Sequence, residues 1–439
     1  MPGQWVAGAQ SVVITPPVGV DLCGFGGRGG PSQGVHDELR AGALHLADGT
    51  NEALLITADL VGLHHEEVAQ VRSGISDAIG IGPEAVMISC SHTHSGPATR
   101  CLNYLGRHDE AYLVELMRKL VGVGRAARQA AASAQVACAR WPVSVGVNRR
   151  ESRDGQIVLG VNEEGVTAPY VDVLYVDDLN GRPVARVFCH AAHAVTLGGD
   201  NLLISGDWPG QAQREVLRCY GDECVAMFMQ GCCGNINSHP RGSFEVARAQ
   251  GRTMAGAIAQ ADATAVRTSH GGVRAASVPV QLPLMPAPSI QEAQKLHDGC
   301  VEQAREARQT GNYGTKLMFE GLVQWAAEIV HIAQSGPAQR YAPFEVQALR
   351  VGDMAFVGLP GEVFVEYALN IDAASPLDIT AVAAYTNGNV GYIPTARAYA
   401  EGGYETDSAI RFYGTTMPQP DSEQLILVAA AEALDEING

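Results

Sequence analysis

Apolar runs of strand length alternate with amphipathic segments in the first part of the chain. Residues 53–58 and 85–90 are almost entirely apolar, and residues 65–79 between them repeat apolar positions with the period of a helix. This succession predicts a βαβ unit with a right-handed crossover. Asp59 and His92 lie at the carboxyl ends of the two runs. Because ligand sites of open α/β sheets lie at the carboxyl ends of strands, we expect chemistry at this edge.

The same two patterns continue to the end of the chain. They predict strands at 171–176, 184–188, 224–229 and 354–358, and helices at 109–134, 242–262, 290–308, 319–333 and 421–437. Prolines at 279, 283, 286 and 288 predict a strand followed by a linker-like stretch near 271–289. We therefore expect an α/β fold, with a mixed β-sheet core flanked by helices, organised as one domain over residues 1–439.

Composition and charge exclude several classes of protein. With 46% hydrophobic and 18% charged residues over 439 positions, the chain is typical of a compact globular enzyme and not of a disordered one. A net charge of -17 disfavours a general nucleic-acid surface and binding to anionic lipid. No apolar run approaches the roughly 20 residues of a membrane span.

The cysteines and the start of the chain bear on the compartment. Residues 1–5 lack the charged and apolar regions of a signal peptide, so none is expected. The ten cysteines are scattered through apolar segments without a CxxC pair, which predicts a reduced, cytoplasmic chain. Adjacent Cys232 and Cys233 are the exception, because a thiol enzyme using one of them is an alternative that sequence leaves open.

The most informative segment is the motif Ser91-His92-Thr93-His94-Ser95-Gly96-Pro97 after the run 85–90. Side chains alternate along a strand, so both imidazoles would point to one side of its end. Neutral imidazole nitrogens on one face suit a borderline-soft metal such as zinc. The alternative is two ordinary hydrogen-bonded polar residues at a strand end.

Further candidate ligands also follow apolar runs or lie in glycine-rich loops. His190 and His193 follow the run 184–188, and Glu362 follows the run 354–358 and a Pro-Gly turn. Tyr392 and Tyr404 lie in glycine-rich segments. Each has an ordinary alternative: a hydrogen-bonded histidine, a helix N-terminal acid or a packing tyrosine. A zinc site nevertheless needs a third and fourth ligand from such places.

Taken together, these pieces resemble the neutral, non-lysosomal ceramidases, a family of zinc amidases. The resemblance rests on Ile14-Thr15-Pro16-Pro17, Gly24-Phe25-Gly26-Gly27, the motif 91–97, Ile204-Ser205-Gly206-Asp207, the loop 230–237, the loop 358–362 and Gly391-Tyr392. It implies a zinc ion held by His92, His193, Glu362 and Tyr392. It also implies that His94 lies beside the substrate, that Arg149 contacts the reacting group, and that Tyr404 is a further active-site tyrosine.

Two departures from the family pattern concern the substrate. Asn237 stands where the family has a serine important for amide cleavage, with Ser238 displaced by one residue. Asparagine can donate a hydrogen bond to substrate but cannot act as a nucleophile. The family's C-terminal immunoglobulin-like domain is also expected to be missing. Both departures lead us to expect an acyl compound smaller and more polar than long-chain ceramide.

The sequence thus predicts a zinc-dependent hydrolase that cleaves an N-acyl amide bond with metal-activated water. An ester or lactone hydrolase on the same site is the nearest alternative, and a non-catalytic metal-binding protein is another. The expected partner is a small molecule with an acyl group. We also expect Asp59 and Asp207, each after a strand-like run, to orient ligand histidines through the second ring nitrogen.

Overall fold

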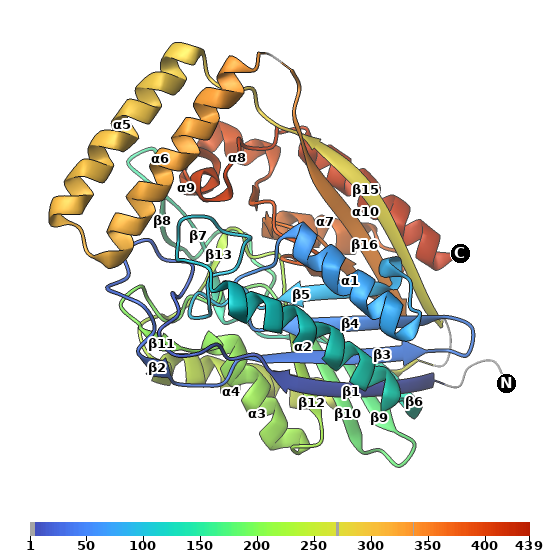
Figure 1. Cartoon of the computed structure of the whole chain (residues 1–439). Coiled ribbons are helices and arrows are strands. Elements are labelled where there is room, and N and C mark those ends of the chain that lie inside the picture. Colours follow the sequence, from blue (N-terminus) through green and yellow to red (C-terminus); the bar gives the residue numbers. More distant parts are fainter. Residues whose placement is uncertain (1–4, 269–271, 337) are drawn as a thin grey trace.

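The computed structural model describes residues 5–268, 272–336 and 338–439 (Figure 1). Its largest sheet has the strand order β12-β10-β9-β6-β1-β3-β4-β5, with β14 paired to β6. These strands are β1 (Trp5–Val13), β3 (Arg40–Ala47), β4 (Glu52–Ala58), β5 (Val86–Cys90), β6 (Ala132–Pro142), β9 (Tyr170–Asp178), β10 (Pro183–His190), β12 (Val225–Gln230) and β14 (Val266–Arg267). A second sheet has the order β15-β16-β17-β19, formed by β15 (Val273–Pro283), β16 (Tyr341–Val351), β17 (Met354–Gly358) and β19 (Ile379–Ala383).

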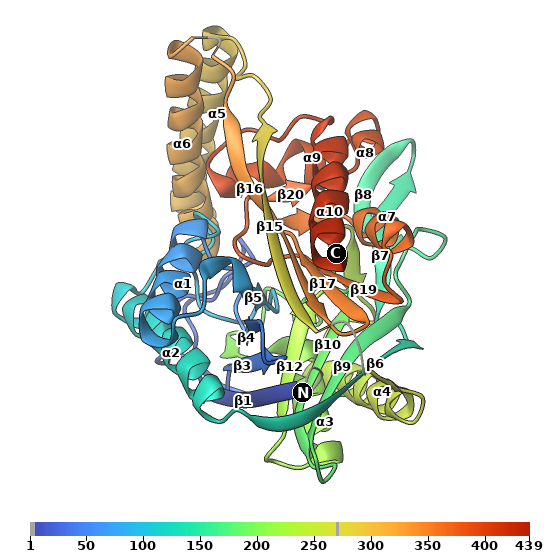
Figure 2. The ribbon, with the colours of Figure 1, turned by 90° about the vertical axis from the view of Figure 1, so that its right-hand side faces the viewer.

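The two sheets pack against each other and carry helices on their outer faces (Figures 1 and 2). Alternation along β12 illustrates this, because Met227 and Met229 join the cluster between the sheets while Phe228 packs on the helical side. The helices of the first sheet are α1 (His65–Ile79), α2 (Glu110–Gln129), α3 (Asp207–Tyr220) and α4 (Phe244–Asp262). Those of the second are α7 (Val365–Ala374) and α10 (Ser422–Asn438). The result is a four-layer α/β arrangement.

Smaller elements complete the fold at one end of the sheets. The strands are β2 (Gly34–Val35), β7 (Gly146–Arg153), β8 (Gln156–Asn162), β11 (Leu203–Ile204), β13 (Ile236–Ser238), β18 (Glu362–Val363) and β20 (Tyr392–Ile393). The short helices are α8 (Ala396–Glu401), α9 (Tyr404–Asp407), η1 (Pro83–Ala85) and η2 (Ala409–Tyr413). Helices α5 (Ile290–Thr310) and α6 (Tyr313–Gln334) form an antiparallel hairpin that stands out from the sheets (Figures 1 and 2).

Three parallel strand pairs direct their carboxyl ends to one place. They are β4 with β5, β10 with β12, and β17 with β19. Isolated bridges from Ser89 to Thr386 and from Gly231 to Ala383 join the ends of β5 and β12 to the segment after β19. Loops that are far apart in sequence therefore meet where the two sheets come together, at the edge expected for a site.

Most predicted elements are confirmed, and the α/β class with them. Strand β17 has the predicted bounds, and β4 and β5 pair in parallel around α1 as expected of a βαβ unit. The helix predicted over 109–134 ends at Gln129, because residues from Ala132 onward form β6, which pairs with β1 and β9. Here sheet pairing outweighs the helix-favouring alanines.

The proline-rich stretch near 271–289 also forms more regular structure than predicted. Residues from Val273 form β15, and Ser289 caps α5. Gly271, at the start of this stretch, lies outside the described residues. So do residues 1–4, where no signal peptide was expected. Pro279 is tolerated because β15 is an edge strand, paired only with β16. Within the described ranges, none of the helices is long and apolar enough to cross a membrane.

Candidate metal centre

The backbone around the metal centre takes up conformations that ordinary residues avoid. His92, just past β5, has a φ of 58°, and Tyr385, just past β19, has a φ of 51°. A left-handed backbone costs a non-glycine residue on the order of 1–3 kcal/mol, and such strain gathers at functional sites. The His92 imidazole and the Tyr385 ring stack with centroids 3.9 Å apart. The strained turns thus place two aromatic rings face to face at the strand ends.

Backbone carbonyls orient the imidazoles of His92 and His193. Nδ1 of His92 lies 2.6 Å from the carbonyl oxygen of Val61, and Nδ1 of His193 lies 2.6 Å from that of Cys233. A carbonyl only accepts, so each Nδ1 carries the donated proton and each Nε2 of the neutral ring is a bare lone pair. Both side chains are buried, with relative exposures of 0% and 1%.

The two bare nitrogens face the carboxylate of Glu362. Oε2 of Glu362 lies 3.1 Å from Nε2 of His193 and 3.5 Å from Nε2 of His92. Burial lowers the pKa of His193 to about 4, so its ring is neutral near pH 7. Burial opposes ionisation of Glu362, but the neighbouring imidazoles hold the pKa of its carboxyl well below the usual range. Acceptor atoms gathered in this way need a cation between them, so the donor set fits zinc.

His94 lies at the edge of the same cluster. Its Nε2 is 3.0 Å from Nε2 of His92, and its Nδ1 has no hydrogen-bond partner among the described residues. A nitrogen of each of His92, His94 and His193 falls within 4.8 Å of the others. The half-buried ring of His94 packs edge-on against Phe25, 5.1 Å away. The geometry alone admits His94 as a ligand or as a neighbour of the metal.

Tyr392 and Glu362 are placed together by a short parallel sheet. They are direct register partners in the pair β18–β20, so their side chains leave the same face. The Tyr392 hydroxyl oxygen accepts a hydrogen bond from a terminal nitrogen of Arg149 at 2.9 Å. Burial raises the pKa of Tyr392 well above its usual value, against the opposing effect of Arg149. All four predicted ligands therefore gather at one place, while their role in holding a metal stays a prediction.

Arg149 joins the other predicted residues to this cluster. The guanidinium is buried, donates from Nε to Glu405 at 2.8 Å, and lies 3.4 Å from Nε2 of His193. It also donates to Oδ1 of Asn237 at 3.3 Å. The ring of Tyr404 lies edge-on to that of Tyr392, 5.8 Å between centroids. The predicted group of Arg149, Asn237 and Tyr404 thus surrounds one side of the centre.

The serine next to Asn237 does not replace the family's serine. Alternation along β13 turns Ser238 away from Asn237. The Ser238 hydroxyl is fully buried and accepts from Thr196 at 3.0 Å, outside the cluster. The position that faces Arg149 is therefore an amide in this chain.

His190 lies apart from the cluster, as the preference for His193 predicted. Its Nδ1 donates to the carbonyl of Tyr170 at 2.7 Å, and its Nε2 accepts from the amide of Val145 at 3.4 Å. Both ring nitrogens are therefore used within the core.

The prediction that Asp59 and Asp207 orient ligand histidines is wrong. Asp59 accepts from the Arg40 amide and from Gln213, and Asp207 accepts from backbone amides at residues 196, 197 and 208. Backbone carbonyls do the orienting instead, because each imidazole is already within 2.6 Å of one.

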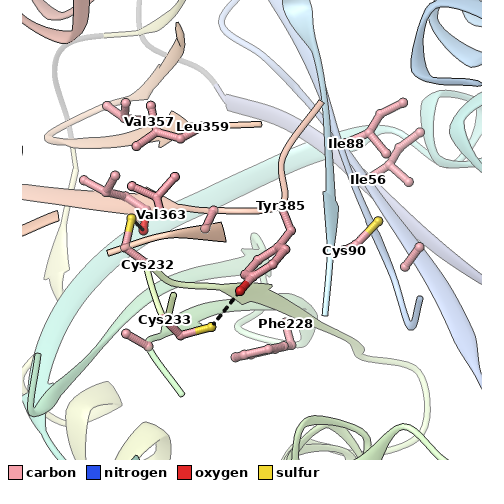
Figure 3. Close-up of a cluster of buried hydrophobic side chains, with 14 of the residues drawn as sticks. Ile56, Ile88, Cys90, Phe228, Cys232, Cys233, Val357, Leu359, Val363 and Tyr385 are labelled. Carbon is pink, nitrogen blue, oxygen red and sulfur yellow. Dashed lines mark hydrogen bonds between the residues drawn. The ribbon is translucent and has the colours of Figure 1, made fainter. Parts of the chain in front are cut away.

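The adjacent cysteines are packing residues of the core. Figure 3 shows the Tyr385 ring between Cys90 and the pair Cys232–Cys233, with the Tyr385 hydroxyl 3.3 Å from the Cys233 sulfur. Burial raises the pKa of both the Cys232 and the Cys233 thiol. A buried thiol without a stabilised thiolate is a poor nucleophile, which argues against a thiol enzyme. All ten cysteines are free.

Three residues of the centre were missed from sequence. The Tyr385 hydroxyl donates to Oε2 of Glu362 at 3.3 Å, and the Tyr413 hydroxyl donates to its Oε1. Glu405, fully buried, receives both Arg149 and Arg150, the latter at 2.7 Å. Glu405 directly follows the predicted residue Tyr404 in the sequence, which is the signal that could have found it. Neither Tyr385 nor Tyr413 has a local pattern that marks it.

A glycine makes room for His94. A Cβ at Gly24 would lie 2.4 Å from the His94 ring, and Gly24 has a φ of +93°. Gly24, the first residue of the motif Gly24–Gly27 that carried part of the family resemblance, is therefore a close approach of backbone to this histidine.

Comparison with solved structures bears on this arrangement as a whole. Neutral ceramidase from Pseudomonas aeruginosa superposes with a TM-score of 0.74 and 18% identity, covering 100% of this chain and 74% of that chain. The chain has the fold of the neutral ceramidases. A ceramidase complexed with C2 matches with a TM-score of 0.71 and 16% identity, over 99% of this chain and 75% of that one.

Sequence comparison points the same way. Neutral ceramidase B of Dictyostelium discoideum is 25% identical over 213 residues, which are 44% of this chain and 29% of that protein. The match thus spans less than a third of the relative's length. No family model matches the chain. The resemblance to the neutral ceramidases is confirmed.

Proposed function

We propose that this chain is a zinc-dependent hydrolase that cleaves an N-acyl amide bond. The observation that carries the proposal is the pair of bare imidazole nitrogens of His92 and His193 facing the Glu362 carboxylate in a buried site. His92, His193, Glu362 and Tyr392 would hold the ion. Support also comes from the three similar proteins reported above, which are named as ceramidases.

The ion and the side chains would divide the work. Zinc, when bound, supplies a Lewis acid that polarises a carbonyl and lowers the pKa of water toward ~7. The His94 imidazole, which lies 3.0 Å from Nε2 of His92, would accept a proton from the attacking water and return it to the leaving amine. The positive charge of Arg149, held by Glu405, would stabilise negative charge that develops on the carbonyl oxygen.

Asn237 and Tyr404 would position the acyl group. The Asn237 oxygen is engaged by Arg149, which leaves its amide N–H groups for substrate. Burial keeps Tyr404 protonated by raising its pKa, so its hydroxyl is available as a donor. Neither side chain can attack the substrate, so water is the nucleophile in this proposal.

The substrate would be smaller and more polar than long-chain ceramide. A cavity of about 440 Å³ reaches Tyr413, the residue that donates to Glu362, and is lined by polar side chains such as Arg100 and by apolar ones such as Leu284 and Val390. This volume is toward the lower end of the roughly 300–1,000 Å³ of small-molecule sites. A larger cavity of about 1020 Å³ lies beside Arg150 and Glu366, and neither cavity is lined by any of the four proposed ligands.

Metal analysis combined with a substrate panel tests the proposal. The purified chain should contain zinc, lose activity to a chelator and regain it on addition of zinc. Among matched N-acyl, ester and lactone compounds, short polar N-acyl compounds should be turned over fastest and long-chain ceramide slowly. Faster turnover of esters or lactones would reassign the bond. Activity that survives complete removal of metal would contradict the proposal. Efficient release of sphingosine from long-chain ceramide would contradict the proposed substrate size.

A further inference from the structure

The two oxygens of Glu362 have different surroundings. Oε2 faces Nε2 of His193 and of His92, at 3.1 Å and 3.5 Å, whereas Oε1 accepts a hydrogen bond from the hydroxyl of Tyr413. A carboxylate on a flexible side chain can rotate about its last bond. A hydrogen-bond donor held on one oxygen therefore fixes the orientation of the carboxylate plane, and with it the direction in which the other oxygen faces the histidines.

We propose that Tyr413 is a positioning residue of the metal centre and that the α5–α6 hairpin holds it in place. The inference rests on the proposed function, since it needs a cation at Glu362. Hydrogen-bond partners of ligating carboxylates fix the orientation of the ligand and thereby contribute to metal affinity. Tyr413 is such a partner, reaching Glu362 from η2, 51 residues further along the chain.

The glycine before the proposed ligand Tyr392 makes room for this tyrosine. Gly391 has a φ of +105°, and a Cβ at this position would lie 3.1 Å from the Tyr413 ring. The ring packs directly on the loop that carries Tyr392. The Tyr413 hydroxyl and ring thus contact both segments from which the second half of the centre is built.

The helical hairpin holds the segment that carries Tyr413. The indole N–H of Trp325, on α6, donates to the carbonyl of Thr415 at 3.2 Å, and the guanidinium of Arg411 lies over the Trp325 ring at 5.7 Å. Phe412 packs on the cluster of buried side chains between α5 and α6, and its carbonyl accepts from the Asn103 amide at 2.8 Å. Residues 411, 412 and 415, which flank Tyr413, are therefore held by the hairpin or by the loop that carries Asn103.

Removing the one hydroxyl group tests the proposal. Tyr413→Phe is compared with Tyr399→Phe, a matched control that removes the hydrogen bond from a half-buried tyrosine to the Pro418 carbonyl at 2.7 Å without touching Glu362. Zinc affinity is measured by competition with a chromophoric chelator, and the visible absorption spectrum is recorded after loading with Co²⁺. We expect Tyr413→Phe to bind zinc about 10–100-fold more weakly, with a changed cobalt spectrum. Tyr399→Phe should match the wild type in both.

A zinc affinity of Tyr413→Phe within about twofold of the wild type, with an unchanged cobalt spectrum, would overturn the inference. Trp325→Phe tests the hairpin separately, because it removes the hydrogen bond to Thr415 but leaves Tyr413 and Glu362 in the chain. Trp325→Phe should also weaken zinc binding, by a smaller factor than Tyr413→Phe. It also decides the question if Tyr413→Phe fails to fold. If Tyr413→Phe folds, unchanged affinity in Trp325→Phe removes the hairpin from the proposal; if it does not fold, the same result overturns the proposal as a whole.

The wild-type protein separates this inference from the proposed function. If the wild type binds neither zinc nor cobalt, the metal centre itself is refuted, and the role of Tyr413 with it. If the wild type and Tyr413→Phe bind zinc equally well, only the role of Tyr413 fails.

Discussion

The two halves of the candidate metal centre are built by different means. The histidine half, from the loops after β5 and β10, is held by backbone: Nδ1 of His92 and of His193 each lie 2.6 Å from a carbonyl oxygen. The carboxylate half, from the segments after β17 and β19, is held by side chains, because Tyr385 and Tyr413 donate to the two oxygens of Glu362. A carbonyl is present whatever the side chain, whereas a phenol can be lost by one substitution. We therefore expect single substitutions to alter the geometry of the carboxylate half, and thereby metal affinity, more easily than they alter the histidine half.

Arg149 connects the two halves. It lies 3.4 Å from Nε2 of His193 on one side and donates to the Tyr392 hydroxyl at 2.9 Å on the other. Its own position is set by Glu405, which also receives Arg150. A buried ion pair of this kind is costly to break, because removing one partner leaves an uncompensated buried charge. The link between the halves is thus a fixed charge network.

The largest effect is expected in the histidine half, where His92→Ala should abolish zinc binding. His94→Ala should keep zinc and lower kcat by about 10²–10⁴, the usual contribution of a general acid–base group. Zinc content by elemental analysis and turnover of the best N-acyl compound separate the two outcomes. Equal loss of zinc in both variants would instead indicate a site made by all three imidazoles, which lie within 4.8 Å of one another.

The link between the halves should show the next largest effect. Arg149→Lys keeps a positive charge but cannot reach Glu405, Asn237 and Tyr392 together, so kcat should fall by about 10²–10³ with zinc retained. Arg150→Lys is the matched control, since Arg150 binds the same Glu405 but not Tyr392. Its kcat should fall less than that of Arg149→Lys, because the Arg150 guanidinium contacts Glu405, Glu401 and Gly402 and neither Tyr392 nor Asn237. Similar losses in both variants would mean that Arg149 acts through the stability of the fold.

A moderate effect is expected at Asn237, beside the histidine half. Asn237→Ala removes the acceptor of Arg149 at 3.3 Å and the amide donors, and should lower kcat about tenfold. Asn237→Ser retains both functions in a smaller group and should lose less. If Asn237→Ser instead cleaves long-chain ceramide much faster than the wild type, residue 237 sets the choice of substrate.

The smallest effect on the centre is expected from Asp59→Asn, which should leave zinc binding unchanged. Burial raises the pKa of Asp59 from 3.8 to about 6, so the folded state binds this proton more tightly than the unfolded state. The unfolding free energy of the wild type should therefore fall by up to about 3 kcal/mol as pH rises from about 4 to above 6. Urea unfolding across that range should show this loss in the wild type and not in Asp59→Asn. If the unfolding free energies of the two proteins changed with pH in the same way, the pH dependence would not arise from Asp59.

Local patterns of the chain were sufficient for most elements and marked candidates for the donor atoms of the centre. The apolar run 354–358 forms a strand with the predicted bounds, and the His-x-His motif lies at the end of a strand as predicted. His92, His193, Glu362 and Tyr392 were candidates because each follows a strand or a glycine turn, and the resemblance to the ceramidases selected them over neighbours such as His190. These are properties of short segments, which alternation and turn residues record.

Only the folded chain assigned the partners of those atoms. Tyr413 reaches Glu362 across 51 residues, and Glu405 reaches Arg149 across 256. Asp59, in contrast, follows a strand as a site residue would and still bonds elsewhere. A hydrogen bond between side chains depends on distances set by the packing of two sheets and their helices, and no repeat along the chain records those distances. The sequence therefore indicates the candidate donor residues of the centre, while tertiary packing decides how their side chains are oriented.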